Sequence, residues 1–540
     1  MRYTLILLFF ILPCFSTLAQ VKFLARFEVE SGDFDPTFEM APIPQGLVSF
    51  RTISKGAFNV DRVFQYFISD ENLNSENIVE LPVKNGFDMI GYDLEGNNLF
   101  IIFQKGSSLS SEKYVLEIDL KTRKGKEYLL NNILEMSLSE FLVQQRSVIV
   151  LGIPDTRPVI QVFNLDNKSV HTVQGIYGND TQILQIRKRQ DIASFEVVLS
   201  RKGKYREREI SINSYDLEGN LLREIDIDQF GDEDQEIMDA ILVSGSNYSQ
   251  MMVGAFGLER RNSYQGMYAL DINEFGEYEE RLYTLSDFPE FYNYLDERGK
   301  LRKAKEVEKA MKKEKIPSIQ DNYSIRQVLP LDDGMLLYFD HFDVVNMRGN
   351  SRNTSYSSRT IYRPFPNQGL GGGGVYDPFP TTPVSPNNLN FQVETEFTYV
   401  SAHFVRLGNE GQVVWDNATT YNNLRTNYPE SFGQIALVED EFYHAYVRDD
   451  KIVLSYLKSG EKVFEDLDFE IELIEENERI SQTDYHTLRL IHWYDRYFLL
   501  AGTQKIRYQK EEGGSATRDV YFVSKVLFAG DLYEPEEKLE

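Results

Sequence analysis

The chain has 540 residues, 42% of them hydrophobic and 26% charged, which is typical of a globular protein with enough apolar material for a core. Its 57 basic and 84 acidic residues give a net charge of −27, which disfavours nucleic acid and anionic lipid as partners. The single cysteine, Cys14, falls within an N-terminal leader, so we expect neither a disulfide nor a thiol catalyst in the mature protein.

The first 19 residues have the pattern of a secretory signal peptide. Arg2 is a short basic start, residues 4–15 form an apolar run too short to span a bilayer, and Thr17-Leu18-Ala19 places small residues at the −3 and −1 positions. We therefore expect cleavage after about Ala19 and a periplasmic or secreted protein. Lipidation at Cys14 is the alternative. No later run is apolar and long enough to predict a transmembrane segment.

Beyond residue 20 the chain is dominated by short strands, rich in Val, Ile, Tyr and Phe, that form hairpins across polar turns. The residues that open five successive turns are Asp70, Asp119, Asp166, Asp216 and Asp271. They are spaced by 49, 47, 50 and 55 residues, and Asn409 and Lys458 repeat the spacing of 49. A repeat of about 50 residues with four short strands is typical of a β-propeller blade, and each hairpin would supply the third and fourth strands.

The two ends of this repeat indicate how the ring closes. The strand VKFLARFEVE (21–30) precedes the first full repeat, whereas the last repeat (486–528) has only three strands. We expect residues 21–30 to complete the last blade and so remove open edges. The sequence therefore predicts an all-β fold, a single propeller over residues 20–530 followed by an acidic tail, 531–540. Eight blades are favoured, and seven or six are the alternatives.

The hexapeptide YDLEGN occurs twice, at residues 92–97 and 215–220. The first copy falls between the first and second strands of a blade, and the second copy falls between the third and fourth. Both turns should therefore emerge on one face of the ring, which we call the turn face. Because Asp, Gly and Asn favour tight hairpins, we interpret both copies as turns and give Asp93 and Asp216 no calcium or ligand role.

A first insertion, residues 287–316, is predicted to be helical. Asp287 and Glu290 look like an N-terminal capping pair. Apolar residues at helical spacing are Phe288, Phe291, Tyr292 and Leu295, followed by Leu301, Ala304, Val307 and Met311. Residues 300–315 hold eight basic and three acidic residues, a net +5. This helix could dock an acidic partner or a lipid headgroup, but we expect a solvated helix that rests its stripe on the propeller or on the chain's own acidic groups.

A second insertion, residues 346–390, mixes arginines and aromatics with Gly and Pro. A loop this long in a compact domain is either functional or disordered, and arginine with aromatic residues is typical of binding anchors. The predicted partner-binding residues are Arg348, Arg352, Arg359, Tyr362, Arg363, Phe365, Tyr376 and Phe379. Both insertions should leave the ring opposite the YDLEGN turns, on what we call the insertion face.

Catalytic and metal signals are weak. DHFD at 340–343 would send Asp340 and Phe342 to one side of a strand and His341 and Asp343 to the other. A metal site there lacks supporting spacing, so we expect no metal and no cofactor.

The D-x-x-G-N hairpins at Asp93 and Asp216 resemble those of bacterial propellers of the broad NHL and TolB-like type, and the likeness in pattern covers most of residues 21–528. Propellers host both binding proteins and enzymes. We expect an exported, non-catalytic scaffold that binds a protein or cell-envelope component, and no nucleic acid, through the insertion face. The alternative is an envelope hydrolase or lyase acting on carbohydrate or peptide, with carboxylates in the propeller channel.

Overall fold

The structure is a computed structural model of the whole chain. It describes residues 21–530 except 33–34, 56–60, 76, 107–111, 155–156, 179–180, 190–191, 203–207, 228–229, 231–234, 238–239, 245–248, 259–262, 320–321, 347–373, 376–394, 427–431, 476 and 511–513. The predicted signal peptide and acidic tail therefore lie outside the described residues.

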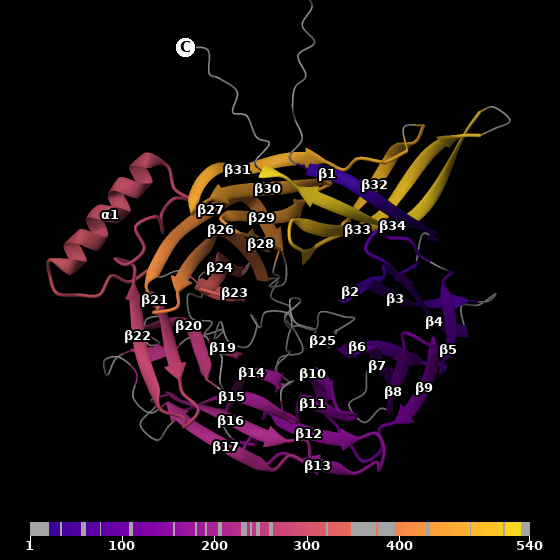
Figure 1. Ribbon diagram of the computed structural model, residues 1–540, viewed down its shortest axis with the longest axis horizontal. Coiled ribbons are helices and arrows are strands. Elements are labelled where there is room, and N and C mark those ends of the chain that lie inside the picture. Colours follow the sequence, from indigo (N-terminus) through magenta and orange to yellow (C-terminus); the bar gives the residue numbers. More distant parts are fainter. Residues whose placement is uncertain are drawn as a thin grey trace, which may run out of the picture.

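Eight antiparallel sheets are arranged as blades around a central axis, which confirms the eight-bladed β-propeller (Figure 1). Blade 1 consists of β2 (Glu39–Ile43), β3 (Gly46–Lys55), β4 (Asp61–Ser69) and β5 (Val79–Val83). Blade 2 consists of β6 (Phe87–Glu95), β7 (Asn98–Lys105), β8 (Lys113–Asp119) and β9 (Lys124–Leu129). Blade 3 consists of β10 (Ser137–Gln144), β11 (Ser147–Ile153), β12 (Val159–Asn164) and β13 (Val170–Thr172). Blade 4 consists of β14 (Gln182–Arg189), β15 (Ser194–Lys202), β16 (Arg208–Asp216) and β17 (Leu221–Ile227).

The second half of the ring is less regular. Blade 5 has β18 (Glu236–Ile237) and β19 (Ile241–Ser244), which both pair with β20 (Gln250–Leu258), then β21 (Ser263–Ile272) and β22 (Tyr278–Thr284). Blade 6 consists of β23 (Asn322–Leu331), β24 (Gly334–Asn346), β26 (Thr395–Gly408) and β27 (Val413–Thr426). Blade 7 consists of β28 (Gln434–Val438), β29 (Glu441–Arg448), β30 (Lys451–Lys458) and β31 (Glu461–Glu470). Blade 8 consists of β32 (Arg479–Tyr494), β33 (Tyr497–Gln509), β34 (Ser515–Phe528) and β1 (Val21–Glu30).

The core is divided among the seams between blades. Eight hydrophobic clusters each join two neighbouring blades, including one that links blade 8 back to blade 1. That last cluster packs Leu47 and Phe67 of blade 1 against Leu499 and Val523 of blade 8. Among the described residues each blade thus packs against a neighbour on both of its faces, which is why its inner strands carry near-continuous apolar runs.

The N-terminal strand closes the ring as predicted. β1 pairs antiparallel with β34, and Val29 lies opposite Tyr521. Arg518 fastens this closure, because its guanidinium donates to Glu28 on β1 (2.7 Å) and to Glu478 beside β32 (2.6 Å). The guanidinium of Arg26 also lies 4.1 Å from the ring centre of Phe522.

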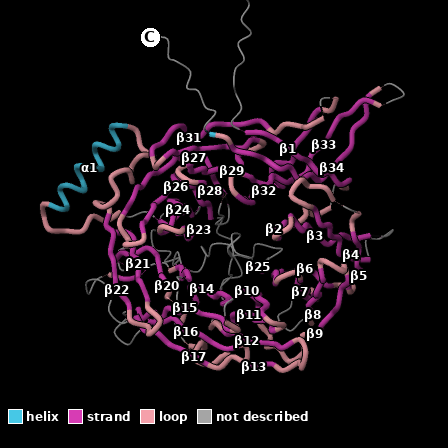
Figure 2. Tube along the Cα trace, in the orientation of Figure 1, coloured by secondary structure: helices cyan, strands magenta, loops and turns pink. Residues whose placement is uncertain are grey.

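Both insertions leave the ring on the same face. The single helix among the described residues, α1 (Glu297–Met311), follows the outer strand β22 and precedes the inner strand β23. The second insertion joins β24 to β26 within blade 6. In a four-stranded antiparallel blade these two kinds of crossing emerge opposite the β6–β7 and β16–β17 turns. Figure 2 shows α1 outside the ring of strands.

The two YDLEGN copies have different structures, which corrects our interpretation of the first. In the second copy β16 ends at Asp216, whose carboxylate accepts from the backbone N–H groups of Glu218 (2.9 Å) and Asn220 (2.8 Å). In the first copy β6 continues through Glu95, and the turn is made by Gly96 and Asn97, with Gly96 at φ +59°. Asp93 is therefore a strand residue and not a turn residue.

Asp93 joins three blades. It is fully buried, and its carboxylate accepts from Lys188 Nζ on blade 4 at 2.7 and 2.9 Å. The backbone N–H of Val143 on blade 3 donates to the same carboxylate at 2.5 Å. Burial raises the pKa of Asp93 to about 6, against the opposing attraction of Lys188. The first hexapeptide is thus a structural link between blades 2, 3 and 4.

Candidate functional site

Residues 285–295, which precede α1, form a strap of turns with three buried apolar side chains, and not the first half of a helix. Residues 285–295 adopt successive turns, and Phe288 and Phe291 are buried in the core between blades 5 and 6. The ring of Phe291 lies 4.4 Å from that of His403 and 5.6 Å from that of Tyr323, centre to centre. The predicted helix over 287–295 is therefore wrong: these apolar residues fill a seam.

The predicted capping pair is also absent. Asp287 turns back and accepts from the backbone N–H (2.7 Å) and hydroxyl (2.9 Å) of Thr284. The backbone N–H of Glu290 donates instead to Asp416 on β27 at 3.1 Å. The residue that caps α1 is Asp296, which accepts from the N–H of Gly299 at 2.7 Å.

Polar contacts fasten the strap to two blades. The Asn293 side chain donates to Asn417 on blade 6 (3.0 Å), and its carbonyl accepts from Lys462 Nζ on blade 7 (3.2 Å). Asp416 itself is 4% exposed, and burial raises its pKa to about 7 while the N–H of Glu290 opposes that shift. These contacts fix the strap, so it gives α1 a firm base. No local sequence pattern predicts them.

The helix itself stands away from the ring. Leu301 and Met311 are 61% and 54% exposed, Val307 is only partly covered, and Gly299 is the buried residue of the helix. The expectation that α1 rests its apolar stripe on the propeller is therefore wrong. The strap fills the place that the stripe was expected to cover.

Beneath the strap lies a buried group of histidines on blade 6. The hydroxyl of Ser401 lies 3.2 Å from His341 Nδ1 and 2.8 Å from His403 Nε2. Burial lowers the pKa of His341 to about 3, so the imidazole is neutral at physiological pH. A serine between imidazoles resembles a nucleophile and its base, but Ser401 is 0% exposed, and the rings of Tyr323 and Phe291 pack against His403. These residues form part of the core.

The opposite side of β24, the strand that carries His341, holds a second polar group. Asp340 accepts from Arg326 Nε (2.8 Å) and from the hydroxyls of Tyr338 (2.8 Å) and Tyr421 (2.9 Å). All four side chains are buried. Asp340 and His341 thus face opposite sides, as the alternation predicts. Among the described residues no three or more His, Cys, Asp and Glu side chains are grouped to hold a metal ion.

All eight predicted partner-binding residues lie outside the described residues, so their arrangement stays a prediction. The second insertion contributes one described element, β25 (Gly374–Val375), which pairs antiparallel with Gly91 and Tyr92 of β6. The insertion starts on blade 6 and so reaches the inner strand of blade 2, inside the ring (Figure 1).

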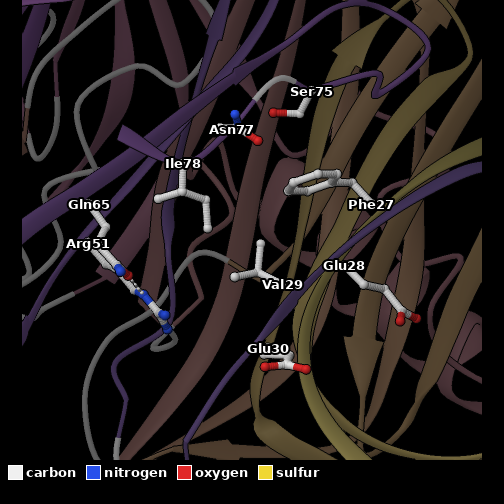
Figure 3. Close-up of a pocket in the computed structure, with 9 residues that line it drawn as sticks. All are labelled: Phe27, Glu28, Val29, Glu30, Arg51, Gln65, Ser75, Asn77 and Ile78. Carbon is white, nitrogen blue, oxygen red and sulfur yellow. Dashed lines mark hydrogen bonds between the residues drawn. The ribbon is translucent and has the colours of Figure 1, made fainter. Parts of the chain in front are cut away.

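A pocket of about 510 Å³ lies at the closure seam between β1 and blade 1 (Figure 3). Phe27 and Val29 of β1 and Ile78 of blade 1 supply its apolar wall. Arg51 lines it too, but this guanidinium already donates to Gln65 (2.9 Å) and to the carbonyl of Pro36 (3.1 Å). These bonds hold Arg51 to blade 1 and to the segment that links β1 to β2.

In comparisons with known proteins, this chain resembles others in fold alone. No protein-family model matches the chain, and no curated protein is similar to it in sequence. A Pyrococcus horikoshii acylaminoacyl peptidase is 9% identical, with a TM-score of 0.33 over 79% of this chain and 52% of that one. The β-propeller domain of the Trilobed protease from Pyrococcus furiosus is 8% identical, with a TM-score of 0.31 over 80% and 94%. Polysaccharide lyase Uly1 is 10% identical, with a TM-score of 0.34 over 81% and 89%. This chain spans about half the length of the peptidase.

Among the described residues no helix has the length and apolarity that a membrane crossing needs.

Proposed function

We propose that the protein is an exported, non-catalytic propeller scaffold that docks a protein or cell-envelope partner through the insertion face. The observation that carries this proposal is the fixed base of the first insertion: buried phenylalanines and polar contacts to blades 6 and 7 hold the strap, while α1 beyond it stays exposed. A rigid base under an exposed element is what a binding surface needs, because little entropy is lost on docking. Export rests on the N-terminal pattern of residues 1–19.

The polar groups of blade 6 weigh against a hydrolase or lyase at that place. Asp340, His341, His403 and Ser401 are buried in the blade, and their hydrogen bonds are internal. A substrate would have to displace the strap to reach His341, His403 and Ser401. Asp340 lies on the other side of β24, bonded to Tyr338 and Tyr421 in the seam between blades 6 and 7. We therefore favour binding over chemistry on this face.

The test is affinity capture from an envelope extract of the source organism, read by mass spectrometry. The baits are residues 20–540 and the same chain with 347–394 replaced by a four-residue glycine-rich turn. Asn346 and Thr395 are paired neighbours on β24 and β26, so a short turn joins them without disturbing blade 6. A matched control carries Lys121→Glu and Lys168→Glu in exposed turns of the turn face.

We expect a partner that the intact chain and the turn-face control enrich and that the loop-replaced chain does not. Equal capture by all three baits would contradict docking through the insertion face. Absence of any partner, together with activity on a carbohydrate or peptide substrate, would favour the enzyme alternative.

A further inference from the structure

The exposed side of α1 carries a line of four cations. Arg298, Arg302, Lys305 and Lys309 stand at positions i, i+4, i+7 and i+11, which a helix of 3.6 residues per turn places on one side. All four are exposed. At 1.5 Å per residue the line is about 16 Å long. We call these four residues the cationic stripe.

The stripe is not neutralised by its own helix. The three glutamates of α1 form ion pairs with other lysines: Glu297 with Lys300, Glu306 with Lys303 and Glu308 with Lys312. Within the described part of the chain, no side-chain hydrogen bond or ion pair engages a residue of the stripe. Glu308 also attracts Lys305 electrostatically, but its ion pair is with Lys312, so one side of α1 carries four cations without an ion-pair partner among the described residues.

An apolar side chain borders the stripe. Leu301 lies three residues after Arg298 and four before Lys305, so it is a surface neighbour of both, and it is 61% exposed. A ligand that matches this surface would carry several negative charges and at least one apolar group.

We propose that α1 docks an acidic segment of a partner protein through the cationic stripe and Leu301. This inference rests on the proposed function, since it names the chemistry of the partner that the insertion face would bind. Acidic side chains spaced along a helix or strand match a line of charges about 16 Å long, and an apolar residue among them would cover Leu301.

The composition of α1 argues against a membrane. A helix that lies in a lipid interface presents a continuous apolar side with Leu, Phe or Trp. On α1 the apolar residues are Leu301, Ala304, Val307 and Met311. They form a narrow stripe in which the large, strongly exposed residues are Leu301 and Met311, and the helix has no aromatic residue.

The charge of the whole chain argues against any extended polyanion. A membrane or nucleic acid that bound α1 would also come close to the rest of the propeller. The acidic residues there give the chain a net charge of −27 despite the basic insertion, and they would repel such a polyanion. A short acidic segment needs to approach only α1, which projects from the ring, and charges more than about 8–10 Å away are largely screened at physiological salt. The surface therefore suits a local protein contact.

The direct test uses a fluorescein-labelled helical peptide with Glu at four positions of spacing i, i+4, i+7 and i+11 and one Leu. Binding to residues 20–540 is followed by fluorescence anisotropy at low and at physiological salt. The stripe variant replaces Arg298, Arg302, Lys305 and Lys309 by Gln, which keeps helix propensity. The matched control replaces Lys300, Lys303, Lys312 and Lys315 by Gln, so it loses the same charge from the same insertion.

We expect the stripe variant to bind the peptide at least about tenfold more weakly and the control no more than about threefold, because only the stripe contacts the probe. Equal weakening in both variants, or no binding by the native chain, would overturn the proposal. Stripe-dependent binding to phosphatidylserine vesicles in place of the peptide would also overturn it. Circular dichroism verifies that both variants keep their fold.

Envelope capture with the same two variants separates this inference from the proposed function. A partner that the stripe variant still captures but the loop-replaced chain loses would refute the role of α1 and leave docking through the insertion face intact. Loss of the partner with the stripe variant, but not with the lysine control, would support both the role of α1 and docking through the insertion face.

Discussion

Asp93 and Asp216 occupy the same position of two identical hexapeptides, and we predict that replacing them by alanine has very different effects on stability. Asp93→Ala removes the buried counter-charge of Lys188, whose side chain is only 9% exposed. It also leaves the backbone N–H of Val143 without its acceptor. Asp216→Ala removes only hydrogen bonds within an exposed turn.

The structure sets the size of both effects. Breaking a buried ion pair by removing one partner costs about 3–5 kcal/mol, because the remaining charge stays buried. We therefore expect Asp93→Ala to lower the free energy of unfolding by about 4 kcal/mol at pH 7.5, where Asp93 is ionised. Loss of the Asp216 turn contacts resembles the loss of a helix cap and should cost about 1 kcal/mol.

Urea denaturation followed by tryptophan fluorescence measures both values. A further variant, Asp93→Leu with Lys188→Met, should recover most of the loss seen for Asp93→Leu alone, since an apolar pair can replace a buried ion pair. If Asp93→Ala and Asp216→Ala differ by less than about 1 kcal/mol, the link between blades 2, 3 and 4 does not stabilise the ring as we describe.

Three further predictions test other parts of the fold. Burial raises the pKa of Asp416 from 3.8 to about 7, so between these pH values the native state keeps a proton that the unfolded chain has released. The tighter proton binding of the native state stabilises it fully below about pH 4, and this stabilisation is lost as pH rises through about 7. Asp416→Asn should therefore reduce the fall in unfolding free energy between pH 5 and 8 by about 2–3 kcal/mol in urea titrations, and an unchanged fall would contradict this assignment. Arg518→Ala should speed hydrogen exchange in β1 more than in blade 4, because it frees Glu28 from the closure; uniform exchange would count against it. Phe291→Ala should lower the free energy of unfolding by about 3–5 kcal/mol because Phe291 is 1% exposed, whereas Leu301→Ala should lower it by less than about 0.5 kcal/mol because Leu301 is 61% exposed. Similar thermal stabilities of the two variants would refute the burial of Phe291 in the strap.

Much of the fold was predictable because a propeller repeats local hairpins. Turn residues such as Asp119 and Asp216 mark the third and fourth strands of each blade, and their contacts lie within a few residues. Ring closure was predictable for a different reason: residues 21–30 form a strand with no neighbour in sequence, while the last repeat lacks one strand. The common face of the two insertions then follows from strand order alone.

The errors come from contacts between distant segments. The letters around Asp93 and Asp216 are identical, and only Val143 and Lys188, 50 and 95 residues from Asp93, distinguish the two sites. The spacing of Phe288 and Phe291 predicts a helix in the strap, but burial between two blades overrides that pattern. A capping pair was expected at Asp287, which instead binds the preceding Thr284.

The candidate site was predicted in part. The sequence identified the basic insertion and its face, but the separation into a buried strap and an exposed helix depends on Asp416, Asn417 and Lys462, which lie more than 120 residues further along the chain. The arginines and aromatics of the second insertion stay a prediction.

The central claim is that the partner binds the insertion face, and cross-linking of the captured complex tests it most directly. An amine-reactive cross-linker read by mass spectrometry reports which lysines lie near the partner. The account predicts cross-links from Lys305 and Lys309 of α1 and none from Lys121 and Lys168, which are exposed in turns of the opposite face. Cross-links confined to Lys121 and Lys168 would contradict it.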